Sequence, residues 1–114
     1  MAIVTITCEN DADFYRQFAY QSIDGTPIDL SGNTLRMGIR HHAIDAVVEL
    51  LLTTENGGLL LTDPVNGRFT VWIKQAQLLE LPLGTHDHSL IRAWGGVHYR
   101  IWSGTLKNNA GPSR

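Results

Sequence analysis

The chain of 114 residues is 43% hydrophobic and 18% charged, a balance that is typical of one folded domain rather than a disordered segment. Its formal net charge of −2 provides no basic excess, so we expect neither nucleic acid nor an anionic membrane as a partner. The single cysteine, Cys8, excludes an intrachain disulfide framework and a multi-cysteine zinc cage. No apolar run approaches the roughly 20 residues of a membrane-spanning helix, and the N-terminus lacks the features of a signal peptide.

The first third of the chain predicts strands separated by turns. Residues 3–7 alternate β-branched side chains and predict a first strand. Residues 13–21 are rich in aromatic side chains and predict a second strand, although the spacing of Phe14 and Phe18 also fits a helix. The Asp24-Gly25-Thr26-Pro27 turn follows at once, which favours the strand.

The middle of the chain continues this pattern. Residues 34–40 alternate between apolar and polar side chains and predict a strand, with Arg36 and Arg40 facing outward. Residues 46–52 are apolar on both faces and predict a buried strand, with a short helix as the alternative. Two turn sequences, Asn56-Gly57-Gly58 and Asp63-Pro64-Val65-Asn66-Gly67, then enclose a short strand and precede another, at residues 69–73.

The last third of the chain predicts one helix and one hairpin. Residues 74–81 are helix formers without β-branched side chains, and Pro82 and Gly84 end the segment. Residues 85–94 and 97–106 flank Gly95-Gly96, a two-residue hairpin signal. We therefore predict an all-β, immunoglobulin-like antiparallel β-sandwich of seven or eight strands, with one short crossing helix near residues 75–81. Residues 1–106 would form this single domain and residues 107–114 a flexible C-terminal tail.

Three groups of turn residues occur in a characteristic order. These are Asp24-Gly25-Thr26-Pro27-Ile28-Asp29-Leu30-Ser31-Gly32-Asn33-Thr34-Leu35-Arg36-Met37, then Asn56-Gly57-Gly58-Leu59 through Asn66-Gly67-Arg68-Phe69-Thr70-Val71, then Leu81-Pro82-Leu83-Gly84-Thr85 with Ser103-Gly104-Thr105-Leu106. In this order and spacing the chain resembles the small immunoglobulin-like domain of tailed-phage and prophage virion proteins. It is similar to the N-terminal domains of siphophage upper baseplate proteins and related tail-region proteins. His86 and His88 stand where that family often carries tyrosines.

The resemblance implies a structural role without catalytic residues or a cofactor. It implies a homo-oligomer or an assembly with other virion proteins, in the tail, baseplate or connector. It also implies localisation in the virion after synthesis in the cytoplasm of the bacterial host. Pairing of edge strands between copies, together with apolar burial, would hold such an assembly.

The histidines are the one metal-like feature of the sequence. His86 and His88 are two residues apart, so on a strand both point to one face, as a zinc pair would. A third ligand would have to come from His98, His41 or His42, and no dense ligand motif is present. We therefore expect no metal, and we interpret His86 and His88 as histidines that fill aromatic positions. Cys8 has no catalytic partner by motif, and we expect it to pack as a small side chain.

The aromatic residues near the last hairpin predict an interface. Trp72 alternates with an inward set and so points outward, and the last strand is apolar on both faces because of Trp102. A bulge or a covering loop would explain Trp102 without an interface. A subunit contact would explain it as well, since Trp, Tyr and Arg are enriched at interfaces. The candidate interface residues are Trp72, Arg92, Trp94, Tyr99, Arg100 and Trp102.

Three functions compete on this basis. The first is the virion structural module, which is not an enzyme. The second is a carbohydrate- or protein-binding β-sandwich that uses exposed Trp and Tyr as its platform. The third is a small metal-dependent enzyme, which only stoichiometric zinc on His86 and His88 would support.

Overall fold

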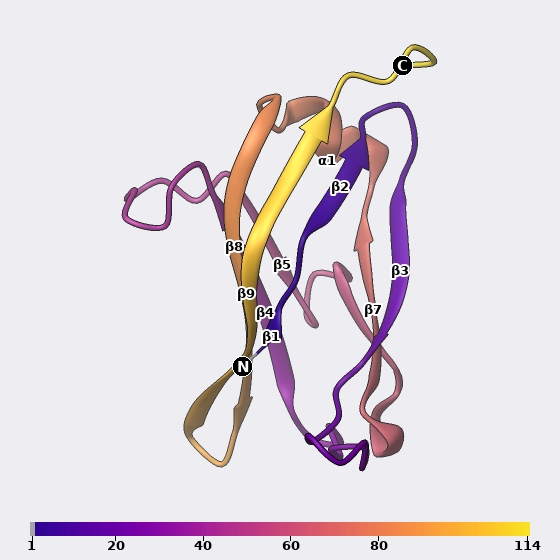
Figure 1. The fold of residues 1–114 in the computed structure, drawn as a ribbon, viewed down its shortest axis with the longest axis vertical. Helices are drawn as coiled ribbons and strands as arrows, with labels where there is room; N and C mark the ends of the chain where they lie inside the picture. Colours follow the sequence, from indigo (N-terminus) through magenta and orange to yellow (C-terminus); the bar gives the residue numbers. More distant parts are fainter. Residues whose placement is uncertain (1) are drawn as a thin grey trace.

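The computed structural model describes residues 2–114 as two β-sheets that face each other (Figure 1). The long sheet contains β1 (Ala2–Ile3), β2 (Ile6–Glu9), β4 (Thr34–Arg40), β5 (Leu50–Thr53), β8 (Gly84–Trp94) and β9 (Val97–Asn109). The short sheet contains β3 (Phe14–Ala19), β6 (Leu59–Asp63) and β7 (Arg68–Ile73). A 3₁₀ turn, η1 (Pro64–Asn66), precedes β7, and the helix α1 (Gln75–Glu80) leads from β7 to β8. No helix among these residues has the length and apolar character to cross a membrane.

The predicted all-β sandwich with one short helix is confirmed. The long sheet has the order β1-β9-β8-β4-β5, with β2 also on β9, and the short sheet has the order β3-β7-β6. This places β9, β8 and β4 opposite β3, β7 and β6, the strand arrangement of an immunoglobulin-like sandwich. The pairings among β3 to β9 are all antiparallel, as predicted, whereas β1 and β2 run parallel to β9. The alternative helix at Phe14 is excluded, since β3 pairs with β7 over its whole length.

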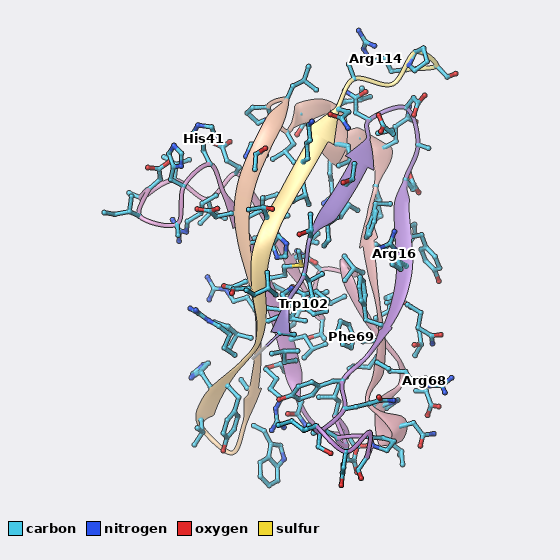
Figure 2. The ribbon with its side chains drawn as sticks, in the orientation of Figure 1. Arg16, His41, Arg68, Phe69, Trp102 and Arg114 are labelled. Carbon is cyan, nitrogen blue, oxygen red and sulfur yellow. The ribbon has the colours of Figure 1, made fainter. Side chains whose placement is uncertain are left out.

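The core lies between the sheets and follows the predicted alternation. Side chains from both sheets, from the connection before β4 and from α1 are fully buried: Ile6, Leu30, Leu35, Met37, Ile39, Leu52, Leu59, Phe69, Val71, Ile73, Leu78, Leu90 and Leu106. Trp102 joins them, with its ring centroid 4.8 Å from that of Phe18 and 5.6 Å from that of Phe69. Figure 2 shows Trp102 and Phe69 in the space between the two sheets.

A β-bulge explains how β9 is apolar on both faces. Leu90 of β8 pairs with Trp102, but the next residue, Ile91, pairs with Arg100, so Ile101 is an extra residue in β9. An extra residue reverses the alternation of side chains. Ile101 and Trp102 are therefore both buried, and the predicted bulge alternative is confirmed.

The strand predicted at residues 46–52 is shorter than expected. β5 begins only at Leu50, and residues 41–49 form a loop that projects from the long sheet (Figure 1). Polar contacts hold this loop in a folded-back path. Arg40 Nη1 donates to the Asp45 carbonyl oxygen at 2.7 Å, and the Asp87 carboxylate accepts from the Ala43 amide at 2.9 Å. These hydrogen bonds hold residues 41–49 in the loop and so keep β5 short. The apolar pattern of the sequence does not indicate them.

The predicted tail at residues 107–114 begins too early. β9 continues through Asn109, paired on one side with β2 and on the other with β8. Asn108 is buried, and Gly111 is buried against Asp11. The Gly111 amide also donates to Asn10 Oδ1 at 2.8 Å. The polar composition of this segment therefore reflects hydrogen bonding to the turn after β2, and the domain extends beyond Leu106.

Candidate functional site

The hairpin between β8 and β9 is the most exposed aromatic feature of the candidate interface. Gly95 and Gly96 have φ angles of 59° and 79°, which is the left-handed pair that a two-residue hairpin turn requires. The hairpin bends away from the short sheet and stands apart from the other loops at that end of the sandwich (Figure 1). Trp94 is 58% exposed, Val97 is 48% exposed and Tyr99 is 40% exposed. Three large apolar side chains thus project from one narrow element.

Arg92 connects this hairpin to the rest of the domain. Its guanidinium lies 4.6 Å from the ring centroid of Tyr99 and 5.6 Å from that of Tyr20. Its Nη1 donates to Asn33 Oδ1 at 3.2 Å. Stacked cations of this kind restrict an aromatic side chain, so Arg92 fixes Tyr99 rather than offering a free charge to a partner.

Trp72 does not lie beside the hairpin. It belongs to the short sheet, near the end of β7 that leads into α1, whereas β8 starts after α1 and carries Trp94 to the opposite end of the long sheet. Trp72 packs edge-on against Tyr15, its Nε1 donates to Asp13 at 3.0 Å, and Lys74 Nζ lies 4.9 Å from its ring. The structure therefore does not unite Trp72 with the hairpin in one patch.

Trp102 was predicted as an interface residue, and its position is a correction. It is only 4% exposed and packs inside the sandwich. Its Nε1 has no hydrogen-bond partner among the described residues. The bulge at Ile101 brings Trp102 inward and at the same time leaves Arg100 exposed on the outer face.

His86 and His88 point to the same face, as expected, but that face is the core. His86 Nε2 lies 2.7 Å from the Pro82 carbonyl oxygen, and His88 Nε2 lies 3.2 Å from that of Thr105. Burial lowers the pKa of His88, because desolvation disfavours the charged ring. The His41 ring lies 5.7 Å from that of His86, yet no group of three potential ligands within residues 2–114 could hold a metal. The interpretation of His86 and His88 as buried aromatic replacements fits this geometry.

Cys8 is buried, and burial raises its pKa to about 11. Since the thiolate is the nucleophile, a thiol in this environment is unreactive at neutral pH. Arg16 is the nearby charge that opposes this shift. Cys8 therefore serves packing, as predicted.

Arg16 is a charged side chain on the inner face of an edge strand. It lies on β3 between Phe14 and Phe18 (Figure 2), with its guanidinium 5.1 Å and 6.0 Å from their ring centroids. An inward-pointing charge on an edge strand hinders the addition of another strand. β6, the other edge of the short sheet, is interrupted by a register shift between Leu60 and Asp63.

The β5 edge of the long sheet is closed by a side chain. The antiparallel pattern directs the backbone groups of Leu51 and Thr53 away from β4. Asn56 takes the place of a neighbouring strand there: its Nδ2 donates to the Leu51 carbonyl, and its Oδ1 accepts from the Thr53 amide, both at 2.9 Å. The same oxygen accepts from the Gly58 amide at 3.0 Å. Edge pairing between copies thus meets an obstacle at β3, β5 and β6.

The outer face of the long sheet contains a hollow that the sequence did not reveal. It has a volume of about 980 Å³ and is lined mostly by residues of β4, β5, β8 and β9, together with Ile3 of β1, Ala43 and Val48 of the loop before β5, and Glu55 after it. Gly38, Ser89 and Ser103 are register partners across its centre. The alternation in residues 34–40 places Gly38 outward, but only the register between strands shows that Ser89 and Ser103 lie in the same row.

No protein-family model matches this sequence, and no curated protein matches it. Among solved structures, the chain is similar to the X-ray structure of the endo-beta-1,4-mannanase from Thermotoga petrophila, with a TM-score of 0.55 and 11% sequence identity. The similarity covers 94% of this chain and 18% of that chain, so the chain spans less than a fifth of the mannanase. At this identity, the likeness concerns the fold alone.

Proposed function

We propose that this chain is a non-enzymatic structural module of a tailed-phage or prophage virion that associates with copies of itself in the tail, baseplate or connector. The order of its turn motifs supports the virion assignment. The observation that carries the self-association is the projecting β8–β9 hairpin, where Trp94, Val97 and Tyr99 are exposed together. Exposed aromatic side chains grouped on a rigid element are typical anchors of protein interfaces.

The contact is made by the hairpin and not by edge strands. Arg16 hinders pairing at β3, and Asn56 occupies the free backbone groups of β5. The hairpin has no such obstacle, and Arg92 holds Tyr99 in place before binding. A side chain that is fixed in advance loses less conformational entropy on association.

The self-association is tested by light scattering coupled to size-exclusion chromatography, between about 500 and 5 µM protein. We expect a discrete oligomer of the 12.7 kDa chain that Trp94→Glu dissociates. Loss of an aromatic anchor costs about 2 kcal/mol or more, so a two-fold contact that loses two anchors weakens by roughly a thousandfold. The matched control is Tyr15→Glu, an exposed aromatic residue on the short sheet, which keeps the wild-type mass. A wild-type monomer at 500 µM refutes self-association.

The virion assignment has its own test. Particles released from the strain that encodes this chain should contain it in a fixed ratio to the other structural proteins, as measured by quantitative mass spectrometry. Its absence from purified particles refutes the virion assignment and leaves the hairpin contact to be judged separately.

A binding platform for carbohydrate remains the second candidate, because Trp94 and Tyr99 are exposed near each other in sequence. Trp72 is a weaker platform, since Tyr15 packs against it and Lys74 lies over its ring. Saturable quenching of tryptophan fluorescence by an oligosaccharide, abolished by Trp94→Ala, would favour this candidate over self-association.

A further inference from the structure

The hollow on the outer face of the long sheet is a trough that crosses the strands. Its floor is the register row Gly38–Ser89–Ser103, with Leu51 at one end and Ile3 at the other. These residues lie on β5, β4, β8, β9 and β1 in turn. Four steps of about 4.8 Å between strands give a length of about 19 Å, which accommodates roughly six residues of extended chain.

Two arginines form one wall of the trough. Arg36 and Arg100 are both register partners of Ile91, so they lie in one row beside the floor. Both are exposed. Among residues 2–114, neither guanidinium has a hydrogen bond or an ion pair. Two steps between strands place their backbones about 10 Å apart.

The opposite wall is electrostatically balanced. Arg40 and Asp87 are register partners there, about 13 Å along β4 from the row of Arg36. Both groups are already engaged, Arg40 with the Asp45 carbonyl and Asp87 with the Ala43 amide. Glu55, two residues beyond Thr53, the register partner of Arg36, also lines the hollow. The Arg36–Arg100 side, with two arginines and one glutamate, therefore has the net positive charge of the trough.

The bulge in β9 creates this wall. Without the extra residue Ile101, Arg100 would share the inward face of Trp102. β-bulges commonly re-aim a side chain next to functional sites. The same irregularity thus completes the core with Trp102 and adds the second arginine to the trough.

We propose that this trough binds an extended acidic peptide segment of a partner protein. Acidic side chains at alternate positions of the segment would point to one side, about 7 Å apart, and reach Arg36 and Arg100. Guanidinium groups match carboxylates by paired hydrogen bonds. The glycine and serine floor leaves room for a backbone and offers hydroxyl groups to it. Within the described residues no Phe, Tyr or Trp ring lines the trough, which favours a peptide over a neutral sugar that would stack on such a ring.

This inference goes beyond the proposed function, because it concerns a second surface and a different partner. It does not depend on self-association through the hairpin. A monomeric protein can bind the peptide, and an oligomer that ignores the peptide refutes only the trough.

The test is a titration of the ¹⁵N-labelled chain with the peptide acetyl-(Ser-Glu)₃-amide at 50 mM NaCl, followed by amide chemical shifts. We expect saturable shifts at Gly38, Ser89 and Ser103, with a dissociation constant below about 1 mM, a typical weak peptide affinity. Acetyl-(Ser-Gln)₃-amide should bind at least tenfold more weakly. Raising the NaCl concentration to 500 mM should weaken the binding of the acidic peptide, because salt screens exposed charges.

Arginine variants test whether peptide binding depends on Arg36 and Arg100 or only on the overall charge of the chain. Arg36→Gln and Arg100→Gln should each weaken binding roughly threefold to fivefold, the range for an exposed ion pair, and the double variant at least tenfold. Arg68→Gln, an exposed arginine on the short sheet, is the matched control and should change nothing. The dispersion of the amide spectrum reports whether each variant is folded.

Several outcomes overturn the proposal. These are the absence of saturable shifts up to 10 mM peptide, shifts located on another surface, equal binding of the glutamine peptide, or an unchanged affinity in the double variant. Tighter binding of oligogalacturonate in the trough would assign it to an acidic glycan and would also overturn the peptide.

Discussion

Asn108 provides the sharpest test of the described packing. It lies in the part of β9 beyond Leu106 and is buried. Its Nδ2 donates to the Leu78 carbonyl at 2.9 Å and to the Leu81 carbonyl at 3.0 Å. These carbonyls belong to the end of α1 and the residue after it, where helical carbonyls lack partners of their own. The strand thus closes the helix, and two acceptors depend on one amide.

The cost of removing this amide follows from those two bonds. A buried hydrogen bond contributes about 1 kcal/mol, and an acceptor left unpaired costs about 1–3 kcal/mol. We expect Asn108→Ala to lower the free energy of unfolding by about 2–4 kcal/mol. Asn108→Asp keeps the shape of the side chain but places a carboxylate oxygen beside two carbonyl oxygens. We therefore expect it to lower the free energy of unfolding by about 3–5 kcal/mol at pH 7.

The aspartate variant also has a pH dependence of known sign. Burial beside two carbonyls raises the pKa of the introduced carboxyl above its unfolded value of about 3.9. The variant is then most stable below pH 4 and loses stability relative to the wild type as the pH rises through the folded pKa. The neutral acid can donate one of the two lost bonds.

Urea unfolding followed by tryptophan fluorescence measures these differences at pH 7 and pH 4.5. Asn109→Ala is the matched control, because its amide makes one long bond of 3.3 Å to an exposed carboxylate of Glu9, and we expect a change below about 0.5 kcal/mol. If the free energy of unfolding of Asn108→Asp lies within about 1 kcal/mol of the wild-type value at pH 7, the Asn108 amide is not the donor to the carbonyls at the end of α1.

Three further predictions follow from close contacts and burial. A Cβ on Gly104 would lie 1.9 Å from the Val4 carbonyl oxygen, so Gly104→Ala should lower the free energy of unfolding by about 2 kcal/mol or more. Gly38→Ala is the control in the same urea experiment and should be nearly neutral, because a Cβ at Gly38 would meet open space. The Cys8 thiol has a pKa of about 11, so at pH 8 it should react with a disulfide reagent only at the rate of unfolding, and rapid labelling of the folded chain would contradict this. The free energy of unfolding should fall between about pH 9 and 11, because the thiol of the unfolded chain ionises first. Asn56→Ala should lose about 1–2 kcal/mol, since its partners are open to water, and should form higher-order species by light scattering because the β5 edge becomes free.

Much of the fold was predictable because it rests on local patterns. The alternation in residues 34–40 and the Gly95-Gly96 turn each determine their element from a few neighbouring residues, and both elements have the predicted form. The short helix was predictable for the same reason. The parallel pairing of β1 and β2 with β9 joins the two ends of the chain, and no local signal encodes that contact.

The candidate site was less predictable, because it depends on register between distant strands. A strict two-residue period places Arg100 and Trp102 on the same face of the last strand. A single inserted residue, Ile101, separates them, so that Trp102 lies in the core and Arg100 on the outer face. The sequence indicated that the last strand is apolar on both faces, but it did not indicate where the extra residue lies. Trp72 was correctly predicted to face outward from β7, but the two sheets separate it from the hairpin.

The edges and the hairpin together explain how such a domain can be specific about its partners. An open sheet edge accepts any strand, since backbone hydrogen bonds carry no sequence information. Arg16 and Asn56 oppose that general contact at β3 and β5. Under the two proposals, recognition would depend on side chains, apolar on the hairpin and cationic along the trough. Because the hairpin and the trough differ in chemistry, the two proposed contacts, with copies of the chain and with an acidic peptide, would not compete with each other.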